Sequence, residues 1–259
     1  MSRHNEVMKK LYGKILGIYN SDKYKNYREQ EKVIEKVFSE NGVFTKLGQE
    51  NLQQIVLLKV SVLDSFYSTN LAKFGIYEVA KHIADLEYKE QIHQKIRNAN
   101  PQNYDELKGI IKQIAECERQ DGKQKVFYSF ATKYCFHHNQ NTFRIYDSFV
   151  REALVFFNNG KSDKSNARFN IPSELVGTNF FRAKLTNKEL KDYKNYDIFL
   201  KAIDRFATRY GFENKNAQDR RDLDHFLWIL GKTQIYLRKS STFAGAMRNI
   251  WNLKAFNGI

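Results

Sequence analysis

Residues 127–150, FYSFATKYCFHHNQNTFRIYDSFV, decide the fold that we expect for this chain. The aromatic run that opens the stretch includes the small residues Ser129 and Ala131, and it predicts a helix that ends near Asn139. After a polar turn, Asp147 directly precedes apolar residues at helical spacing. An aspartate in this place accepts backbone N–H bonds at the positive end of a helix dipole. The stretch therefore predicts a helix, a loop and a second helix entered at Asp147, and helix capping alone accounts for this aspartate.

Long helices are expected outside this stretch as well, because the chain of 259 residues contains only 2 prolines and 13 glycines. Apolar residues nearly encircle the segment 49–68, which predicts a central buried helix. One-sided apolar spacing predicts amphipathic helices around it. They are expected at 26–41, 76–87, 103–118, 189–210 and 220–235. We find no internal repeat and no β-rich region, so the expected fold class is all-α.

The length exceeds the usual size of one domain, so the helices form either one large unit or two packed lobes. We expect a single compact helical unit over residues 1–259, and a division into two lobes is the alternative. In that case residues 45–157 form the core, and residues 1–44 together with 173–259 form the second lobe. The polar stretch 158–172, NNGKSDKSNARFNIP, connects them as a loop.

The chain is strongly basic, with 43 Lys and Arg against 29 Asp and Glu, a net charge of +14 and a pI near 9.5. This balance favours a polyanionic partner, and we expect DNA, with RNA as the alternative. Coding usage rich in Lys, Asn and Ile is a competing explanation of the charge. The stretch 236–259 interleaves basic and aromatic residues, and we expect it to pack on the core rather than to act as a nucleic-acid arm.

Several classes of protein are excluded by what the sequence lacks. No apolar run approaches the ~18 residues of a membrane span, and the N-terminus has no signal-peptide centre, so we expect a cytoplasmic protein, nucleoid-associated if it binds DNA. Cys117 and Cys135 cannot supply four thiolates for a cluster or zinc site, and we expect no metal or cofactor. Walker, Rossmann, HExxH and GxSxG patterns are absent.

The segments SFATKYC and IYDSFV, in the order helix, loop, apolar triplet, Asp and helix, resemble the second half of the helix-hairpin-helix DNA glycosylases. The resemblance implies a two-lobed helical array and a monofunctional enzyme that hydrolyses the N-glycosidic bond of a flipped damaged or modified base. Asp147 is then the catalytic carboxylate. Bifunctional members carry a lysine 18 residues before it, at position 129 here, where Ser129 stands instead. Lys133, one turn further on, is a poorer candidate for lyase chemistry.

The resemblance also implies residues that receive or replace the flipped base. The helix end VLDSFYSTN at 62–70 is similar in place to the helix that plugs the DNA stack, and Asp64 lies near the general acid of adenine-removing members. Each of these residues has a structural alternative, as a core aromatic or a surface carboxylate. The substrate-binding residues expected in this way are Tyr67, Asn70, Tyr128, Lys133, His137 and Tyr146.

The stretch DGKQKVFYS departs most from the family, whose hairpin usually reads like LPGVG. Gly122 and the backbone amides around Lys123 and Lys125 are still expected to hold a DNA phosphate. This departure from the family's hairpin motif favours a second interpretation. In it the protein is a non-catalytic helical DNA- or RNA-binding protein of genome maintenance or defence. A helical interaction or phage-defence protein that binds another macromolecule is a third reading.

The segment RRDLDHFLWILGK at 220–232 is a further motif with no assigned chemistry. Asp222 or Asp224 is expected to cap its helix, while Leu223, Phe226, Leu227 and Leu230 pack inward. We expect this helix to dock the C-terminal half of the chain onto the core.

Overall fold

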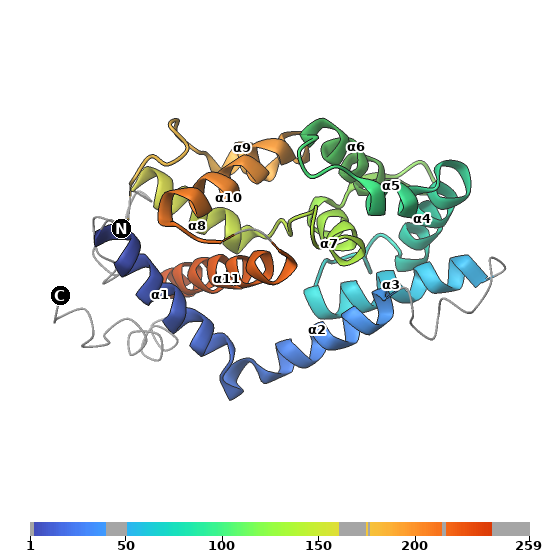
Figure 1. Cartoon of the computed structure of the whole chain (residues 1–259). Coiled ribbons are helices and arrows are strands. Elements are labelled where there is room, and N and C mark those ends of the chain that lie inside the picture. Colours follow the sequence, from blue (N-terminus) through green and yellow to red (C-terminus); the bar gives the residue numbers. More distant parts are fainter. Residues whose placement is uncertain (1–2, 40–50, 161–174, 176, 214–215, 240–259) are drawn as a thin grey trace. The chain divides into compact units, whose positions relative to one another are not determined.

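The computed structural model describes residues 3–39, 51–160, 175, 177–213 and 216–239, with the side chains of 3–4 and 233–239 left out. The described part is mostly helical, which confirms the all-α class (Figure 1). The chain forms two compact units. The inserted unit comprises Asn20–Tyr146 and Asp192–Asp197, and the terminal unit comprises Met1–Tyr19, Asp147–Lys191 and Ile198–Ile259. These boundaries fall after Tyr19 and Tyr146, not after residues 44 and 157. Most of the expected loop at 158–172 lies outside the described residues.

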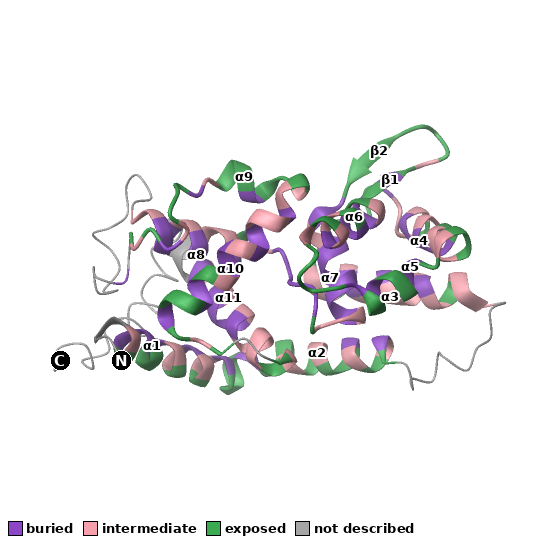
Figure 2. Cartoon of the chain, turned by 45° about the horizontal axis from the view of Figure 1, so that its top comes forward, coloured by how far each residue is buried: buried purple, intermediate pink, exposed green. Residues whose placement is uncertain are grey.

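The inserted unit is built around one helix that is buried on all sides. Its elements are η1 (Asp22–Tyr24), α2 (Lys25–Phe38), α3 (Leu52–Tyr67), α4 (Ile76–Glu90), α5 (Ile92–Asn98), α6 (Tyr104–Ala115), β1 (Glu116–Glu118), β2 (Gln124–Val126), α7 (Tyr128–His138) and η4 (Tyr193–Asn195). Helices α2, α3, α5 and α6 contact α7, and every residue from Tyr128 to His137 except Ser129 is buried (Figure 2).

The central helix is thus α7, and its expected place at 49–68 was wrong. Helix α3 buries only the stripe Val56, Val60 and Leu63, at the i, i+4, i+7 spacing of one helix face. Its other apolar residues remain partly exposed. Apolar residues all around a helix therefore indicate partial cover from several sides, and they do not identify the innermost helix.

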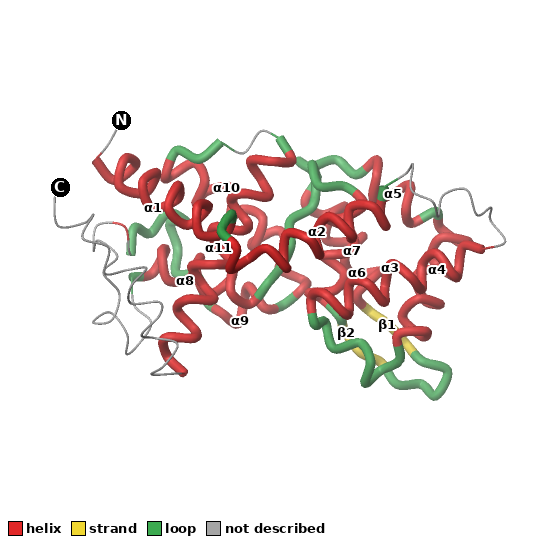
Figure 3. The backbone as a smooth tube through the Cα atoms, turned by 90° about the horizontal axis from the view of Figure 1, so that it is seen from below, coloured by secondary structure: helices red, strands yellow, loops and turns green. Residues whose placement is uncertain are grey.

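A β-hairpin between α6 and α7 was not expected from the sequence. Strands β1 and β2 pair antiparallel with Cys117 opposite Lys125, and the helix expected at 103–118 ends at Ala115 (Figure 3). The connecting turn is closed by two backbone bonds, Arg119 N to Lys123 O and Gly122 N to Arg119 O, both 2.9 Å. Gly122 has φ +76°, which favours glycine at this turn.

The terminal unit joins a helix from the start of the chain to helices from its second half. Its elements are α1 (Arg3–Tyr19), α8 (Ser148–Asn159), α9 (Asn187–Lys191), most of α10 (Tyr196–Tyr210) and α11 (Ala217–Lys239). The helix expected at 189–210 is divided between α9 and α10, because Asp192 accepts a bond from Lys194 N at 3.0 Å and starts the turn η4. Helix α11 includes the expected segment 220–235, and it packs on α8 and α1. The expected cap at Asp222 or Asp224 was wrong, because the helix begins at Ala217 and the side chain of Asn216 accepts from Asp219 N at 2.9 Å.

None of the helices in the described part of the chain combines the length and apolar character that crossing a membrane requires. The residues 240–259, which hold most of the basic and aromatic stretch at 236–259, lie outside the described residues.

Candidate functional site

Asp147 is the N-cap of α8, as the sequence predicted. Its Oδ1 accepts the backbone N–H of Phe149 at 2.7 Å, and its carbonyl oxygen accepts the N–H of Arg151 at 3.0 Å. The residue has the extended backbone of a capping position, with φ −135° and ψ 147°. The carboxylate is partly exposed and is held at the positive end of the α8 dipole.

Three side chains of α7 hold the backbone of Tyr146, the residue before Asp147. Tyr146 N–H donates to Thr132 Oγ1 at 3.0 Å. Its carbonyl accepts from Ser129 Oγ at 3.1 Å and from Lys133 Nζ at 3.5 Å. The three side chains stand at i, i+3 and i+4, which places them on one face of the helix. The segment SFATKYC therefore fixes the peptide that leads into Asp147.

Lys133 is a buried lysine, with 2% of its surface exposed. Its Nζ donates to Ser129 Oγ at 2.5 Å, and it lies 5.3 Å from the centre of the Tyr67 ring. A buried ammonium group needs such partners because its desolvation is costly. The sequence placed Ser129 and Lys133 one helical turn apart, and the structure brings their side chains into direct contact.

Tyr67 and His137 complete this group of residues, which we call the Tyr146 cluster: Tyr67, Ser129, Thr132, Lys133, His137 and Tyr146. Tyr67 Oη lies 3.0 Å from His137 Nε2 and so links α3 to α7. The ring of Tyr128 stacks on that of Tyr146 at 4.2 Å. Tyr128, Lys133, His137 and Tyr146 are at most 9% exposed, whereas Tyr67 and Ser129 remain partly exposed. A ligand can therefore reach Tyr67 and Ser129 more directly than the other members.

Asn70 does not belong to the Tyr146 cluster. It is exposed, and its Nδ2 donates to Ser68 O at 3.0 Å. Ser68 and Asn70 have φ of +50° and +62°, a region that non-glycine residues seldom adopt. Asp64 stabilises this turn, since its Oδ1 accepts from Thr69 Oγ1 at 2.7 Å and from Leu71 N at 2.9 Å. These bonds give Asp64 a structural role.

Two of the backbone amides that were expected to bind a phosphate, those of Gly122 and Lys123, form hydrogen bonds within the hairpin. Gly122 N–H donates to Arg119 O, and Lys123 N–H donates to Asp121 Oδ1 at 3.2 Å. This hydrogen bond from Lys123 lowers the pKa of the Asp121 carboxyl. The carboxylate pairs with Arg119 Nη2 at 3.2 Å and with Lys123 Nζ at 3.5 Å, so its charge is compensated within the turn. Gly122 and Lys123 therefore use their amides inside the hairpin. The side chains of Lys123 and Lys125 are exposed, although Lys123 Nζ pairs with Asp121 and Lys125 Nζ lies 5.0 Å from the centre of the Phe127 ring.

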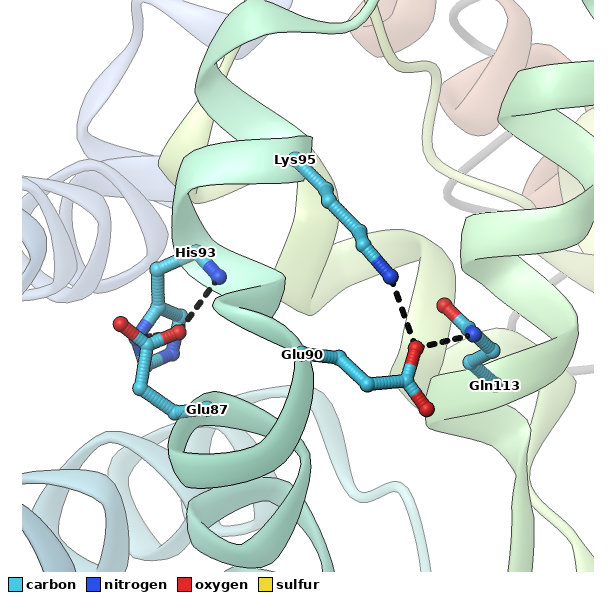
Figure 4. A network of polar contacts seen from close by, with 5 residues as sticks. All are labelled: Glu87, Glu90, His93, Lys95 and Gln113. Atoms are coloured by element: carbon cyan, nitrogen blue, oxygen red, sulfur yellow. Dashed lines mark hydrogen bonds and ion pairs between the residues drawn. The ribbon is translucent and has the colours of Figure 1, made fainter.

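A buried histidine network in the same unit was missed by the sequence reasoning. His93 Nδ1 lies 3.1 Å from Glu87 Oε2, and its backbone N–H donates to Glu87 Oε2 at 2.7 Å (Figure 4). His93 Nε2 lies 2.7 Å from Tyr134 Oη. The ring of His138 stacks on that of His93 at 4.7 Å. Burial lowers the pKa of His93, although the bond to Glu87 opposes this shift. Burial raises the pKa of Glu87, but the bonds from His93 reverse this and leave the pKa lowered.

Spacing along the chain does not reveal this network, because it depends on the turn between α4 and α5. Gln91 has φ +52° and separates α4 from α5, and at this turn the backbone N–H of His93 reaches the Glu87 carboxylate. On the exposed side, Glu90 Oε2 accepts from Lys95 Nζ and from Gln113 Nε2, both at 2.7 Å (Figure 4). The network thus ties α4, α5 and α6 together.

No group of three or more His, Cys, Asp or Glu in the described part of the chain is arranged to hold a metal ion. Cys117 and Cys135 are both buried and free. Burial raises the pKa of the Cys117 thiol to about 12, so this thiol is protonated at neutral pH.

The chain belongs to the family whose model is described as HI_0787_N, N-terminal domain, since this model matches residues 10–142, more than half of the chain. The match includes α7 with Ser129 and Lys133 and ends before Asp147. An uncharacterized protein of Haemophilus influenzae (strain ATCC 51907 / DSM 11121 / KW20 / Rd) is 32% identical over 177 residues, which cover 68% of this chain and 66% of that protein. The chain thus spans just under two thirds of this relative. No solved structure matches the chain.

Proposed function

We propose that the protein is a monofunctional DNA glycosylase of the helix-hairpin-helix kind that hydrolyses the N-glycosidic bond of a flipped damaged or modified base. The place of Asp147 carries the proposal. This residue caps α8 where the chain leaves the inserted unit and enters the terminal unit. The resemblance implies a two-lobed helical array, and the division of the chain into two compact units supports the proposal.

The proposed reaction needs one carboxylate near the sugar. As the bond from C1′ to the base nitrogen breaks, its electron pair leaves with the base, which takes up a proton, and positive charge develops on the deoxyribose. The Asp147 carboxylate stabilises this charge and accepts a proton from the water that adds to C1′. Ser129 has no amine to form an imine with the sugar, and the amine of the neighbouring Lys133 is buried and donates to Ser129 Oγ and Tyr146 O. The product expected is therefore an intact abasic strand.

The decisive experiment uses the variant Asp147→Asn with the matched control Asp192→Asn. Both aspartates cap a helical turn, and asparagine caps equally well, so both variants are expected to fold. Duplex and single-stranded DNA carrying diverse damaged or modified bases is incubated with each protein and then heated in alkali to cut abasic sites. We expect Asp147→Asn to lower the rate by about 10²–10⁴-fold and the control to retain it. Cleavage on no substrate, or full activity in Asp147→Asn, would contradict the proposal.

A non-catalytic nucleic-acid-binding protein is the second candidate, and the internal bonding of the hairpin amides favours it. In this case the protein binds DNA or RNA and releases no base. Replacing Lys123 and Lys125 together by Ser is expected to reduce the slope of log affinity against log salt concentration by up to about 2, because each neutralised phosphate contributes about 0.9. An unchanged slope would remove the hairpin from the binding surface, and no binding at low salt would exclude both candidates.

A further inference from the structure

Helix α11 lies against the first turn of α8 in direct backbone contact. A Cβ atom added at Gly231 would stand 1.7 Å from the carbonyl oxygen of Phe149 and 2.4 Å from its carbonyl carbon. Real Cβ atoms do not approach other heavy atoms within 3.0 Å, so only glycine permits this crossing. Gly231 belongs to the segment RRDLDHFLWILGK, for which the proposed function offers no role.

The residue that Gly231 touches is also the residue that holds Asp147. Phe149 N–H donates to Asp147 Oδ1 at 2.7 Å. A second contact from α11 supports the same turn, since the ring of Trp228 meets that of Phe149 edge to face at 6.4 Å. Lys232 Nζ lies 4.3 Å from the Trp228 ring centre and helps to hold this ring. All of these residues belong to the terminal unit.

We propose that Gly231 is a positioning residue that sets the place of the Asp147 carboxylate through the backbone of Phe149. Any side chain at position 231 moves the Phe149 carbonyl, and with it the N–H that orients Asp147. An error of about 1 Å in the place of a catalytic group can cost about 100-fold in rate. The catalytic consequence rests on the proposed function, whereas the effect on the cap does not.

Other helical glycines offer a matched control. At Gly109 in α6 an added Cβ meets nothing within 4 Å, so alanine fits there and improves the helix. The variants Gly231→Ala and Gly109→Ala therefore carry the same chemical change, one at a backbone contact and one in open space. Trp228→Leu is the second test variant, because it loosens the Phe149 turn without a backbone clash.

The experiment measures hydrogen exchange of the Phe149 amide by NMR, together with kcat and KM for base removal. In Gly231→Ala we expect at least about tenfold faster exchange at Phe149 and a kcat lowered about 10–100-fold with little change in KM. Gly109→Ala should match the wild type, and Trp228→Leu should show a smaller effect in the same direction.

The outcomes test the positioning role of Gly231 and the proposed glycosylase function separately. Phe149 exchange that is unchanged in Gly231→Ala would overturn the positioning role, and so would an unchanged kcat. If Gly231→Ala does not fold, wild-type exchange and kcat in Trp228→Leu overturn it. If the wild type removes no base, the proposed function fails, and the exchange of the Phe149 amide still decides whether Gly231 positions Asp147.

Discussion

The two units hold the residues beside Asp147 by opposite physical means. In the inserted unit, the polar side chains Ser129, Thr132 and Lys133 bind the backbone of Tyr146. In the terminal unit, the backbone of α11 contacts the backbone of Phe149 at Gly231. This close approach is possible because Gly231 has no side chain. Each hydrogen bond to Tyr146 can be removed separately while the others remain. A side chain added at Gly231, in contrast, disrupts the whole contact between α11 and α8. Substitutions on the two sides should therefore lower the free energy of unfolding by different amounts.

The largest effect is expected at the steric contact. Gly231→Ala should lower the free energy of unfolding by about 3 kcal/mol or more, because neither helix can retreat without losing its packing. Gly109→Ala should instead raise it by up to about 1 kcal/mol. Urea denaturation of both variants measures the difference. A loss below about 1 kcal/mol for Gly231→Ala would mean that α11 shifts easily. The contact at Gly231 would then contribute no more to stability than one hydrogen bond to Tyr146.

A smaller loss of stability is expected when one of the hydrogen bonds between α7 and the backbone of Tyr146 is removed. Thr132→Val keeps the shape of the side chain but leaves the buried N–H of Tyr146 without its acceptor, which should cost about 1–3 kcal/mol. Thr208→Val removes an exposed hydroxyl that donates to Asp204 O, and it should change stability by at most about 0.5 kcal/mol. Equal losses in the two variants would show that the bond to Tyr146 contributes nothing specific.

The stability of the protein is expected to depend on pH through the buried histidines of the inserted unit. Burial lowers the pKa of His93 below the ordinary value of 6.5. Between these two pKa values the imidazole is protonated in the unfolded chain and neutral in the folded chain. Stability is therefore full above about pH 6.5 and falls as the pH drops from there toward the folded-state pKa. His138 acts in the same direction, since burial lowers its pKa as well.

Urea denaturation between pH 5 and pH 7.5 measures this dependence. In His93→Gln the loss toward low pH should be smaller than in the wild type, because one of the two histidines no longer titrates. The partly exposed His82, whose Nε2 lies 2.8 Å from Gln113 O, provides the control variant His82→Gln. Identical pH profiles in the wild type and His93→Gln would place the dependence elsewhere.

The helices on both sides of Asp147 were predictable because their signals are local. The apolar spacing after Asp147 and its capping chemistry lie within a few residues, and both survive in the structure. The central place of α7 was not predictable, since Thr132, Lys133 and His137 make its sequence look half polar although all three are buried. Their partners come from other segments of the chain, and spacing within one helix does not reveal them.

The β1–β2 hairpin and the contact between α11 and α8 were not predicted from the sequence, for different reasons. Strands of three residues carry too little alternation to be recognised, so Glu116–Glu118 was assigned to the preceding helix. Gly231 did leave a signal, because an isolated glycine inside a helix costs about 1 kcal/mol relative to alanine and needs a reason. Only the structure identifies that reason as the carbonyl of Phe149.

The division of the terminal unit between distant parts of the chain has a consequence for biosynthesis. Helix α1 packs on α11, which follows about 200 residues later, so α1 waits for its partner during translation. At about 5–20 residues per second this delay lasts roughly 10–40 s. During this time the apolar side of α1, with Val7, Met8, Leu11 and Ile15, has no native cover. We expect chaperones that bind nascent chains to engage this helix while the inserted unit completes its own fold.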